Sequence, residues 1–191
     1  MTDVLLLDVM GTLVYDPFHE EIPAFFGMSL RELFAQKHPD AWIRFEHGEL
    51  TEREMLCSFF ADGRSFDHAA FEATVRGAYR WLDGIERLLS ELRERGTPMH
   101  TMSNYPSWYR WIEAELELSR YLPWTFVSCE TGLRKPAQAA YKNAAETLGV
   151  APERCVFVDD REKNVSAARE VGMRGVVFES AAQLRAELGL G

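Results

Sequence analysis

The segment "LLLDVMGTLVYDPF", residues 5–18, gives the strongest indication of how this chain folds. An apolar run that starts at Val4 indicates a buried strand, and a single aspartate, Asp8, follows at its end. Gly11 and Thr12 then turn the chain away from the strand. The segment therefore predicts a strand that presents one carboxylate at its carboxyl end, beside a tight turn.

The hydrophobic pattern changes its period after this strand. From about Glu20 to Arg80 the pattern is helical and rich in aromatic residues, and it contains no convincing strand. Two segments of this block, 29–32 and 51–54, have the sequence of capping boxes, in which side chains satisfy the free backbone groups at a helix start. We therefore expect a small helical unit directly after the first strand.

Beyond Trp81, strand-like and helical segments alternate. The predicted strands lie at 98–103, 124–128, 154–158 and 174–178, and the predicted helices lie at about 85–95, 106–118, 137–148 and 161–171, followed by a last helix capped by Ser180. This order predicts an α/β fold, in which helices cover both faces of a Rossmann-like parallel sheet. The predicted core comprises residues 1–14 plus 81–191, and residues 15–80 form a helical cap inserted after the first strand.

The composition argues against several classes of protein. A hydrophobic content of 47% and a charged content of 27% are typical of an ordinary soluble globular protein. A net charge of -9 argues against nucleic acid or an anionic membrane as a partner, and no apolar run approaches the roughly 20 residues that span a bilayer. The three cysteines are scattered, which favours free thiols. We expect a cytoplasmic monomer or homodimer without a signal peptide, because the first strand starts almost at Met1.

Polar and charged residues follow the predicted strands at their carboxyl ends, where open parallel sheets bind ligands. They are Asp8 after the first strand, Ser103 and Asn104 after the next, Asp159 and Asp160 after the fourth, and Lys135 in a loop before a helix. One lysine, one hydroxyl and three carboxylates are therefore expected at the same edge of the sheet.

These residue types suit phosphoryl transfer. A carboxylate can attack phosphorus and carry it as an aspartyl phosphate, and one or two more can hold Mg²⁺ beside it. A hydroxyl and an ammonium bind the remaining phosphoryl oxygens. A lone aspartate after a strand usually only stabilises a turn, and a lone lysine is usually solvated, but an adjacent aspartate pair repels itself unless a cation or solvent separates the charges. The whole combination therefore favours a functional site.

Four segments, "DVMGT", "MSN", "GLRKP" and "FVDDREKNVSAAREVGM", resemble the ordered motifs of the haloacid dehalogenase-like (HAD) hydrolase superfamily. The resemblance implies a HAD core with a small cap, in which Asp8 is the nucleophile. The other implied catalytic residues are Ser103 and Lys135, which bind the phosphate. The implied Mg²⁺ ligands are Asp8, the backbone carbonyl of Met10, Asp159 and Asp160, the last of these the more direct, with Asn164 orienting the acidic loop. The residues expected against the substrate are Gly11, Thr12, Asn104, Tyr105 and His19.

Three further segments, "DPFHEEIPAFFGMS", "KHPDAWIRFEHGEL" and "SNYPSWY", are similar to plant chloroplast enzymes that hydrolyse flavin mononucleotide to riboflavin and phosphate. The resemblance implies a Mg²⁺-dependent hydrolase of small phosphomonoesters, with flavin mononucleotide as the leading substrate. The plant enzymes also carry methionine at the place of Met10. Since they have a transit peptide that is not seen here, we expect a bacterial, cytoplasmic relative.

Met10 poses the main mechanistic question. In most phosphatases of the superfamily, an aspartate at this place protonates the leaving alcohol and then activates water. Loss of such a group typically costs about 10²–10⁴-fold per role, and methionine can perform neither role. One explanation is a replacement acid from the first turn of the cap, where Tyr15, Asp16, His19 and Glu20 are candidates. Among them His19 has the ordinary pKa best suited to both proton transfers.

Methionine at this place is also compatible with two further explanations. The substrate could need little acid, as an anhydride or acyl phosphate does, or the leaving group could be a halide, although a dehalogenase would not need the acidic pair for a metal. The chain could also bind a phosphorylated ligand or a partner without turnover. A binder of this kind would retain its ligand and release no phosphate.

A flavin ring would need aromatic side chains to cover it. The available residues are Phe18, Phe25 and Phe26 in the cap and Tyr105 and Tyr109 in the core, of which we favour Tyr105. By contrast, Trp108 shares a helical face with apolar residues and is predicted in the core, and Trp42 and Phe45 are predicted inside the cap.

Overall fold

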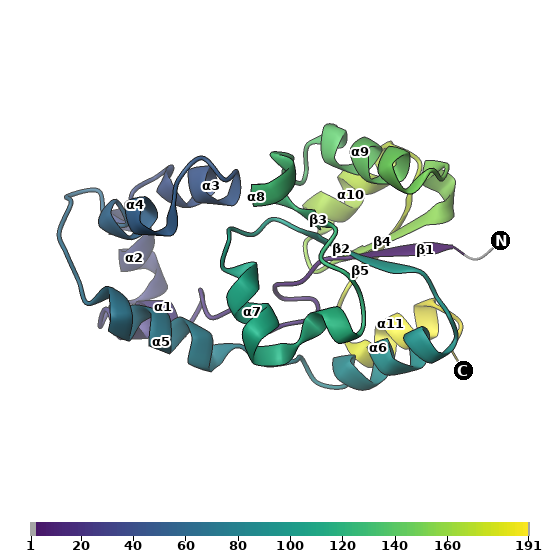
Figure 1. The fold of residues 1–191 in the computed structure, drawn as a ribbon, viewed down its shortest axis with the longest axis horizontal. Helices are drawn as coiled ribbons and strands as arrows, with labels where there is room; N and C mark the ends of the chain where they lie inside the picture. Colours follow the sequence, from purple (N-terminus) through teal and green to yellow (C-terminus); the bar gives the residue numbers. More distant parts are fainter. Residues whose placement is uncertain (1–2, 191) are drawn as a thin grey trace.

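The computed structural model describes residues 3–190, and a five-stranded parallel sheet forms its centre (Figure 1). The strands are β1 (Val4–Leu7), β2 (Met99–Ser103), β3 (Phe126–Val127), β4 (Cys155–Asp159) and β5 (Arg174–Val177). Their order across the sheet is β3-β2-β1-β4-β5, so β1 lies between β2 and β4. The predicted parallel α/β fold is confirmed: β1 begins at Val4 as predicted, and the other four strands occur within two residues of their predicted bounds.

The central strand β1 is buried because its side chains alternate between two separate cores. Leu5 and Leu7 belong to the larger core, which continues into the helical block. Leu6 points to the opposite face and packs in the second core with Phe157 of β4. Burial on both faces explains why the strand is a continuous apolar run rather than an alternating one.

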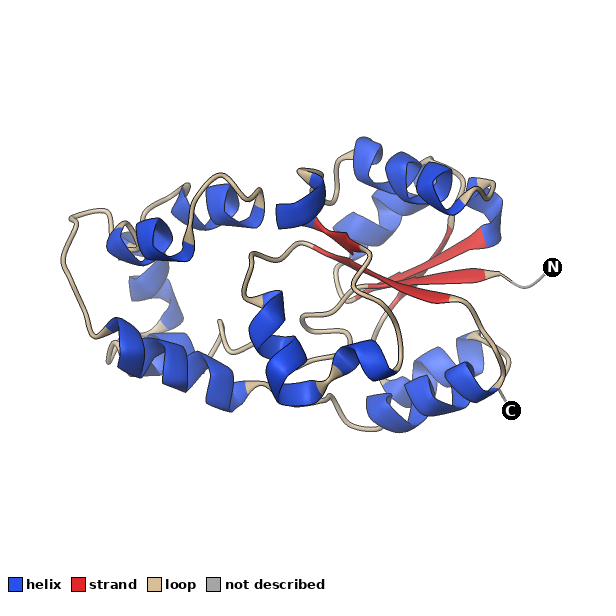
Figure 2. Cartoon of the chain, viewed as in Figure 1, coloured by secondary structure: helices blue, strands red, loops and turns tan. Residues whose placement is uncertain are grey.

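Helices cover both faces of this sheet, as predicted (Figure 2). In Figure 1, α9 and α10 lie on one side of the sheet and α6 and α11 lie on the other. The core helices are α6 (Ile85–Glu94), α7 (Tyr109–Leu116), α8 (Ser128–Thr131), α9 (Gln138–Leu148), α10 (Glu162–Glu170) and α11 (Ala181–Glu187). The one-turn helix α8 was not predicted, because four residues are too few to show a helical period.

The first five helices of the described chain, which follow β1 and precede α6, form the left part of the molecule in Figure 1. They are α1 (Glu21–Phe25), α2 (Leu30–Gln36), α3 (Ala41–Glu46), α4 (Glu52–Cys57) and α5 (His68–Ala78). Both predicted capping boxes are confirmed: Ser29 caps α2 with Glu32, and Thr51 caps α4 with Glu54. We call this helical block the cap, and its boundaries at residues 15 and 80 stay a prediction.

Aromatic side chains pack the interior of the cap. Phe26 contacts Phe25, Phe59 and Phe71, with ring centroids 4.9, 5.3 and 5.6 Å apart. Trp108 of the core is fully buried against the cap, which confirms its predicted place in a core. These rings join the cap and one side of the sheet into one continuous apolar core.

Two expectations from composition were also confirmed. The three cysteines, Cys57, Cys129 and Cys155, are free thiols. Within residues 3–190, no helix is both long and apolar enough to cross a bilayer. The fold is therefore held by apolar packing and backbone hydrogen bonds rather than by cross-links.

Helix α10 packs closely on Gly175 of β5. A Cβ atom there would lie 2.7 Å from Val165 Cγ1 and 3.0 Å from the Val165 carbonyl oxygen. We expect Gly175→Ala to lower the free energy of unfolding by about 1–3 kcal/mol, because the added methyl group overpacks this contact. Gly77→Ala is the matched control, since Gly77 lies on the exposed side of α5 with open space around it. The control should raise stability by up to about 1 kcal/mol in urea unfolding; equal effects of both changes would contradict the close packing.

Candidate active site

Asp8 comes directly after β1 and is buried at the carboxyl edge of the sheet. Its Oδ1 accepts a hydrogen bond from Lys135 Nζ at 2.6 Å, and its Oδ2 accepts one from Thr12 Oγ1 at 3.2 Å. Burial raises the pKa of Asp8 to about 7, even though the nearby Lys135 charge lowers it. The structure thus holds the predicted nucleophile in place and leaves its negative charge only partly compensated.

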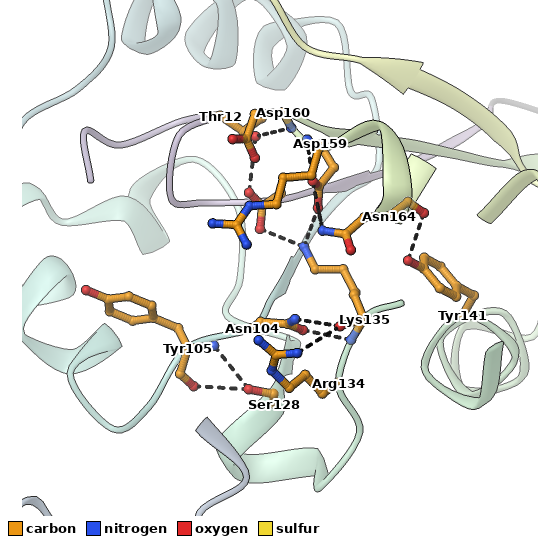
Figure 3. A network of polar contacts seen from close by, with 12 residues as sticks. Thr12, Asn104, Tyr105, Ser128, Arg134, Lys135, Tyr141, Asp159, Asp160 and Asn164 are labelled. Atoms are coloured by element: carbon orange, nitrogen blue, oxygen red, sulfur yellow. Dashed lines mark hydrogen bonds and ion pairs between the residues drawn. The ribbon is translucent and has the colours of Figure 1, made fainter. Parts of the chain in front are cut away.

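Lys135 connects two strand ends. Its Nζ donates to Asp8 and, at 2.7 Å, to Asp159 Oδ2, and its side chain is only 2% exposed. Figure 3 shows this side chain reaching from its loop to the acidic residues. Burial alone would lower the pKa of the Lys135 ammonium, but the two carboxylates outweigh burial and raise it. Lys135 is therefore a charged group within the predicted phosphate site and not a solvated surface lysine.

Asp159 and Asp160 differ in their surroundings at the end of β4. Asp159 is buried and accepts hydrogen bonds from Lys135, from Asn164 Nδ2 at 3.0 Å to both oxygens, and from the Arg161 backbone N–H at 2.9 Å (Figure 3). Asp160 is more exposed and lines the cavity described below. Asn164 thus orients Asp159, as predicted from the sequence, and Asp160 has the carboxylate that is free to bind a ligand.

Gly11 and Thr12 belong to the turn that follows Asp8. Gly11 has a φ of +79°, and a Cβ atom there would lie 2.9 Å from Asp160 Oδ2, so the turn requires glycine. Thr12 is fully buried, donates to Asp8 and accepts the Asp160 backbone N–H at 3.1 Å. Neither residue is among those that line the cavity, and their contact with the substrate stays a prediction. Their positions join the loops after β1 and β4.

Ser103 and Asn104 follow β2. Asn104 lines the cavity and makes two hydrogen bonds of 2.8 Å with the backbone of Lys135, one through its Nδ2 and one through its Oδ1 (Figure 3). Among residues 3–190, Ser103 Oγ is the buried side-chain polar atom that lacks a hydrogen-bond partner. Such a hydroxyl costs free energy unless a ligand or water satisfies it. Ser103 does not itself line the cavity, and its contact with a phosphoryl oxygen stays a prediction that this unsatisfied hydroxyl supports.

Three carboxylates meet at this edge of the sheet. Asp8, Asp159 and Asp160 each have an oxygen within 4.8 Å of the others. Lys135 supplies one positive charge to this cluster, which is too little to balance three carboxylates when all are ionised. The donor set is the oxygen-only type that Mg²⁺ prefers. The geometry therefore fits a Mg²⁺ ion, with Asp159 already well supplied with hydrogen bonds and Asp160 the freer ligand.

A cavity of about 200 Å³ opens between this cluster and the cap. On the core side its lining includes Asp8, Met10, Asn104, Lys135 and Asp160. On the cap side its lining includes Phe18, Phe34, Lys37, Trp42 and Glu46. The cavity thus has a charged end at the sheet and a largely aromatic wall at the cap.

The predicted aromatic cover is partly corrected. Phe18 and Tyr105 line the cavity as expected, and the Tyr105 hydroxyl hydrogen-bonds Tyr79 at 2.8 Å. Phe25 and Phe26 do not line it, because they pack inside the cap. Tyr109 is also absent from the lining and donates to Glu130 at 3.0 Å. Trp42, which was predicted only as cap core, packs there but also faces the cavity.

An ion pair between cap and core was not predicted. Glu46 at the end of α3 is buried, and its Oε2 accepts from Arg134 Nε at 2.5 Å, while its Oε1 accepts from Trp42 Nε1 at 2.8 Å. Burial raises the pKa of Glu46, and Arg134 lowers it. The sequence offers little indication of this ion pair. The spacing of four residues places Glu46 and Trp42 on one helical face, but Arg134 is 88 residues away in the sequence.

Met10 and His19, the two remaining predicted site residues, differ in their position relative to the cavity. Met10 lines the cavity next to Asp8, so its backbone is near the acidic cluster, and its role as a metal ligand stays a prediction. His19 does not line the cavity: its side chain is 56% exposed, and its Nε2 lies 3.8 Å from Asp16 Oδ2. The structure therefore does not support the expected contact between His19 and the substrate.

Similarity to known proteins agrees with this geometry. The haloacid dehalogenase-like hydrolase family matches residues 2–172. The chain is 46% identical to flavin mononucleotide hydrolase 1 of Arabidopsis thaliana, over 97% of this chain and 76% of that protein. It is 29% identical to a sesquiterpene phosphatase of Aspergillus oryzae, over 78% of each. Among solved structures, a HAD family enzyme of Bacteroides thetaiotaomicron, in complex with magnesium and inorganic phosphate, shares the fold with a TM-score of 0.77 and 21% identity, over 94% of this chain and 96% of that one.

Proposed function

Because this chain belongs to the haloacid dehalogenase-like hydrolase family, we propose that it hydrolyses a small phosphomonoester through a phosphoryl intermediate on Asp8. The observation that carries this proposal is the position of Asp8: it is buried at the floor of the cavity, bonded to Lys135, beside two further carboxylates. A carboxylate that lines a cavity beside a buried lysine and two further carboxylates is suited to attack the phosphorus of an ester bound there.

In the proposed reaction, an oxygen of Asp8 forms a bond to phosphorus while the bond from phosphorus to the ester oxygen breaks. Lys135 and the unpaired hydroxyl of Ser103 bind phosphoryl oxygens and stabilise the charge that gathers on them. Water then attacks the phosphorus, and the bond to Asp8 breaks. Asn104 takes part indirectly, because it holds the backbone of Lys135 through two hydrogen bonds.

We propose Mg²⁺ as the cofactor. Asp8, Asp160 and the backbone carbonyl of Met10 would hold it, and Asp159 would support it directly or through water. Bound Mg²⁺ would neutralise negative charge on the phosphoryl group and orient that group toward Asp8.

Flavin mononucleotide is the leading candidate for the substrate. The 46% identity to a plant flavin mononucleotide hydrolase supports this choice. The cap side of the cavity supports it as well, because Phe18, Phe34 and Trp42 offer ring faces and edges to a planar aromatic group. A cytoplasmic location and a monomeric or dimeric state stay proposals from the sequence.

The test is phosphate release from flavin mononucleotide and from a panel of small phosphate esters, each with Mg²⁺ and with a chelator. We expect turnover with Mg²⁺, loss of turnover with chelator, and a preference for flavin mononucleotide over aliphatic esters. Equilibrium dialysis with flavin mononucleotide runs in parallel. Bound flavin mononucleotide without phosphate release from any ester would instead favour a silent phosphate-ligand binder and would refute the proposed hydrolysis.

A further inference from the structure

The cavity contains Met10 where an acid and base would be useful. Alkoxide is a poor leaving group, so hydrolysis of an alkyl phosphate gains about 10²–10⁴-fold from a positioned proton donor. A thioether has no proton to give. The chain must therefore supply this proton from another residue if it hydrolyses alkyl esters.

The structure separates the four candidates of the first turn of the cap. Tyr15 donates its hydroxyl to Glu20 at 3.1 Å and to Glu21 at 2.9 Å, and burial raises its pKa to about 12, so it is a poor acid near neutral pH. Glu20 is exposed and is a hydrogen-bond partner of Tyr15. His19 is exposed as well. None of these three side chains lines the cavity, whereas Asp16 does.

Asp16 is held in a defined orientation. Its Oδ1 accepts the Phe18 backbone N–H at 3.0 Å, and its side chain is only 21% exposed. Burial raises its pKa, and the Phe18 N–H, His19 and Arg161 lower it. The other titratable groups that face it are Glu21, Tyr79 and Tyr105.

Backbone contacts attach the segment before Asp16 to the core rather than to the helices of the cap. Val14 forms bridges with Met10 and Trp81 of the core, and the Tyr15 N–H donates to the carbonyl of Arg80, at the other boundary of the cap, at 2.9 Å. The position of Asp16 relative to Asp8 is therefore set by the core, as a proton donor to the leaving oxygen requires.

Two other ionisable side chains outside the acidic cluster, Glu46 and Lys37, line the cap side of the cavity. Both are less suitable than Asp16 as a donor of the proton. Both oxygens of Glu46 are already bonded, to Trp42 and Arg134. Lys37 lies over the Phe34 ring, 5.5 Å from its centroid, and its charged neighbours are Glu46 and Asp40 of the cap. The charge of Arg161, the residue after Asp160, acts on both Asp16 and Glu46. Within residues 3–190, however, Asp16 Oδ2 makes no hydrogen bond, and its ion-pair partner His19 lies 3.8 Å away.

We propose that Asp16 is the general acid and general base of this site, in place of the residue missing at Met10. The inference rests on the proposed phosphomonoester hydrolysis. As the bond between phosphorus and the ester oxygen breaks, the electron pair stays on that oxygen, which takes the proton of the Asp16 carboxyl and leaves as the alcohol. The Asp16 carboxylate then takes a proton from the attacking water as the oxygen of that water bonds to phosphorus. The Asp8–phosphorus bond breaks, its electron pair returns to Asp8, and phosphate leaves.

The experiment compares Asp16→Asn with wild type on two esters, flavin mononucleotide and p-nitrophenyl phosphate. Asparagine keeps the size of the side chain and its acceptor for the Phe18 N–H. Turnover of flavin mononucleotide should fall about 10²–10⁴-fold. With p-nitrophenyl phosphate, whose phenolate leaves without a proton, the first equivalent should be released rapidly and the phosphoryl group should accumulate on Asp8. Asp83→Asn, the same change at an exposed aspartate outside the cavity, is the matched control and should leave both rates near wild type.

Asp16→Ala with added formate provides a second variant, because a small carboxylic acid can occupy the space and restore proton transfer. Wild-type turnover of flavin mononucleotide by Asp16→Asn would overturn the inference, and so would an equal fall on both esters without a burst or formate rescue, which indicates a structural role. If wild type releases no phosphate from any ester, the proposed function itself fails. The two failures are therefore distinguishable.

Discussion

Asp8→Asn is expected to lower phosphate release by at least about 10⁴-fold, the scale at which loss of a nucleophile acts in other enzymes. The amide has nearly the same shape but cannot form the aspartyl phosphate. Its oxygen can still accept the hydrogen bond from Thr12 that holds the side chain in wild type. The change therefore removes the reacting atom together with the ion pair between Asp8 and Lys135.

Stability provides the control for this variant. Burial raises the pKa of Asp8 to about 7, so its ionised form is costly in the folded state without a bound cation, and a neutral amide should not lower the melting temperature. Acid quenching followed by mass spectrometry of the peptide containing residue 8 should find a phosphoryl group in wild type and none in Asp8→Asn. Asp8→Ala is a second variant, because asparagine can slowly hydrolyse back to aspartate. Residual activity above about 1% in both variants would point to a different nucleophile or to direct attack by water.

The strand ends of the site could be predicted from the sequence because the fold itself brings them together. Asp8 and Asp160 are about 150 residues apart, but each follows a buried strand of a parallel sheet. The carboxyl ends of β1 and β4 are neighbours once the strand order is known. The cluster of Asp8, Asp159 and Lys135 could therefore be predicted from the positions of the strands and of the loop that contains Lys135.

The cap side of the site could not be predicted in the same way. The packing of the cap decides which face of each short helix points toward the cavity. Trp42, for example, both packs against the apolar core and lines the cavity. The same limit explains why His19 was preferred to Asp16. An ordinary pKa favours histidine, but only the fold shows that the histidine is exposed and the aspartate faces the cavity.

The role of Thr12 could not be predicted from the sequence for a third reason. A threonine directly after a glycine turn near a nucleophile is equally consistent with contact to a substrate and with support of the loop. In the structure its hydroxyl donates to Asp8 and accepts the Asp160 N–H, so its one donor hydrogen and one of its two acceptor lone pairs are used inside the protein. Pattern alone does not distinguish these roles, because they differ only in where the hydroxyl points.

Lys135→Met is expected to lower the free energy of unfolding by about 3–5 kcal/mol in metal-free protein, in addition to reducing phosphate release. Lys135 Nζ lies 2.6 Å from Asp8 and 2.7 Å from Asp159, and all three side chains are buried. Methionine fills a similar volume but leaves both carboxylates without a positive partner. Urea unfolding with a chelator, near pH 8 so that carboxylates are ionised, measures the loss. Lys142→Met, at an exposed position of α9, should change stability by no more than about 0.5 kcal/mol.

A double variant separates lost charge compensation from lost packing. Asp159→Asn alone removes one of the two carboxylates that Lys135 compensates, and in the Lys135→Met background it removes one of the two uncompensated charges. The double variant should therefore cost less than the sum of the two single changes, by more than about 1 kcal/mol. Added Mg²⁺ should recover part of the Lys135→Met loss, since a bound cation supplies the missing positive charge and binds only the folded state. Strictly additive losses with no effect of Mg²⁺ would show that Lys135 acts through packing, and that the acidic cluster does not require a cation beside it.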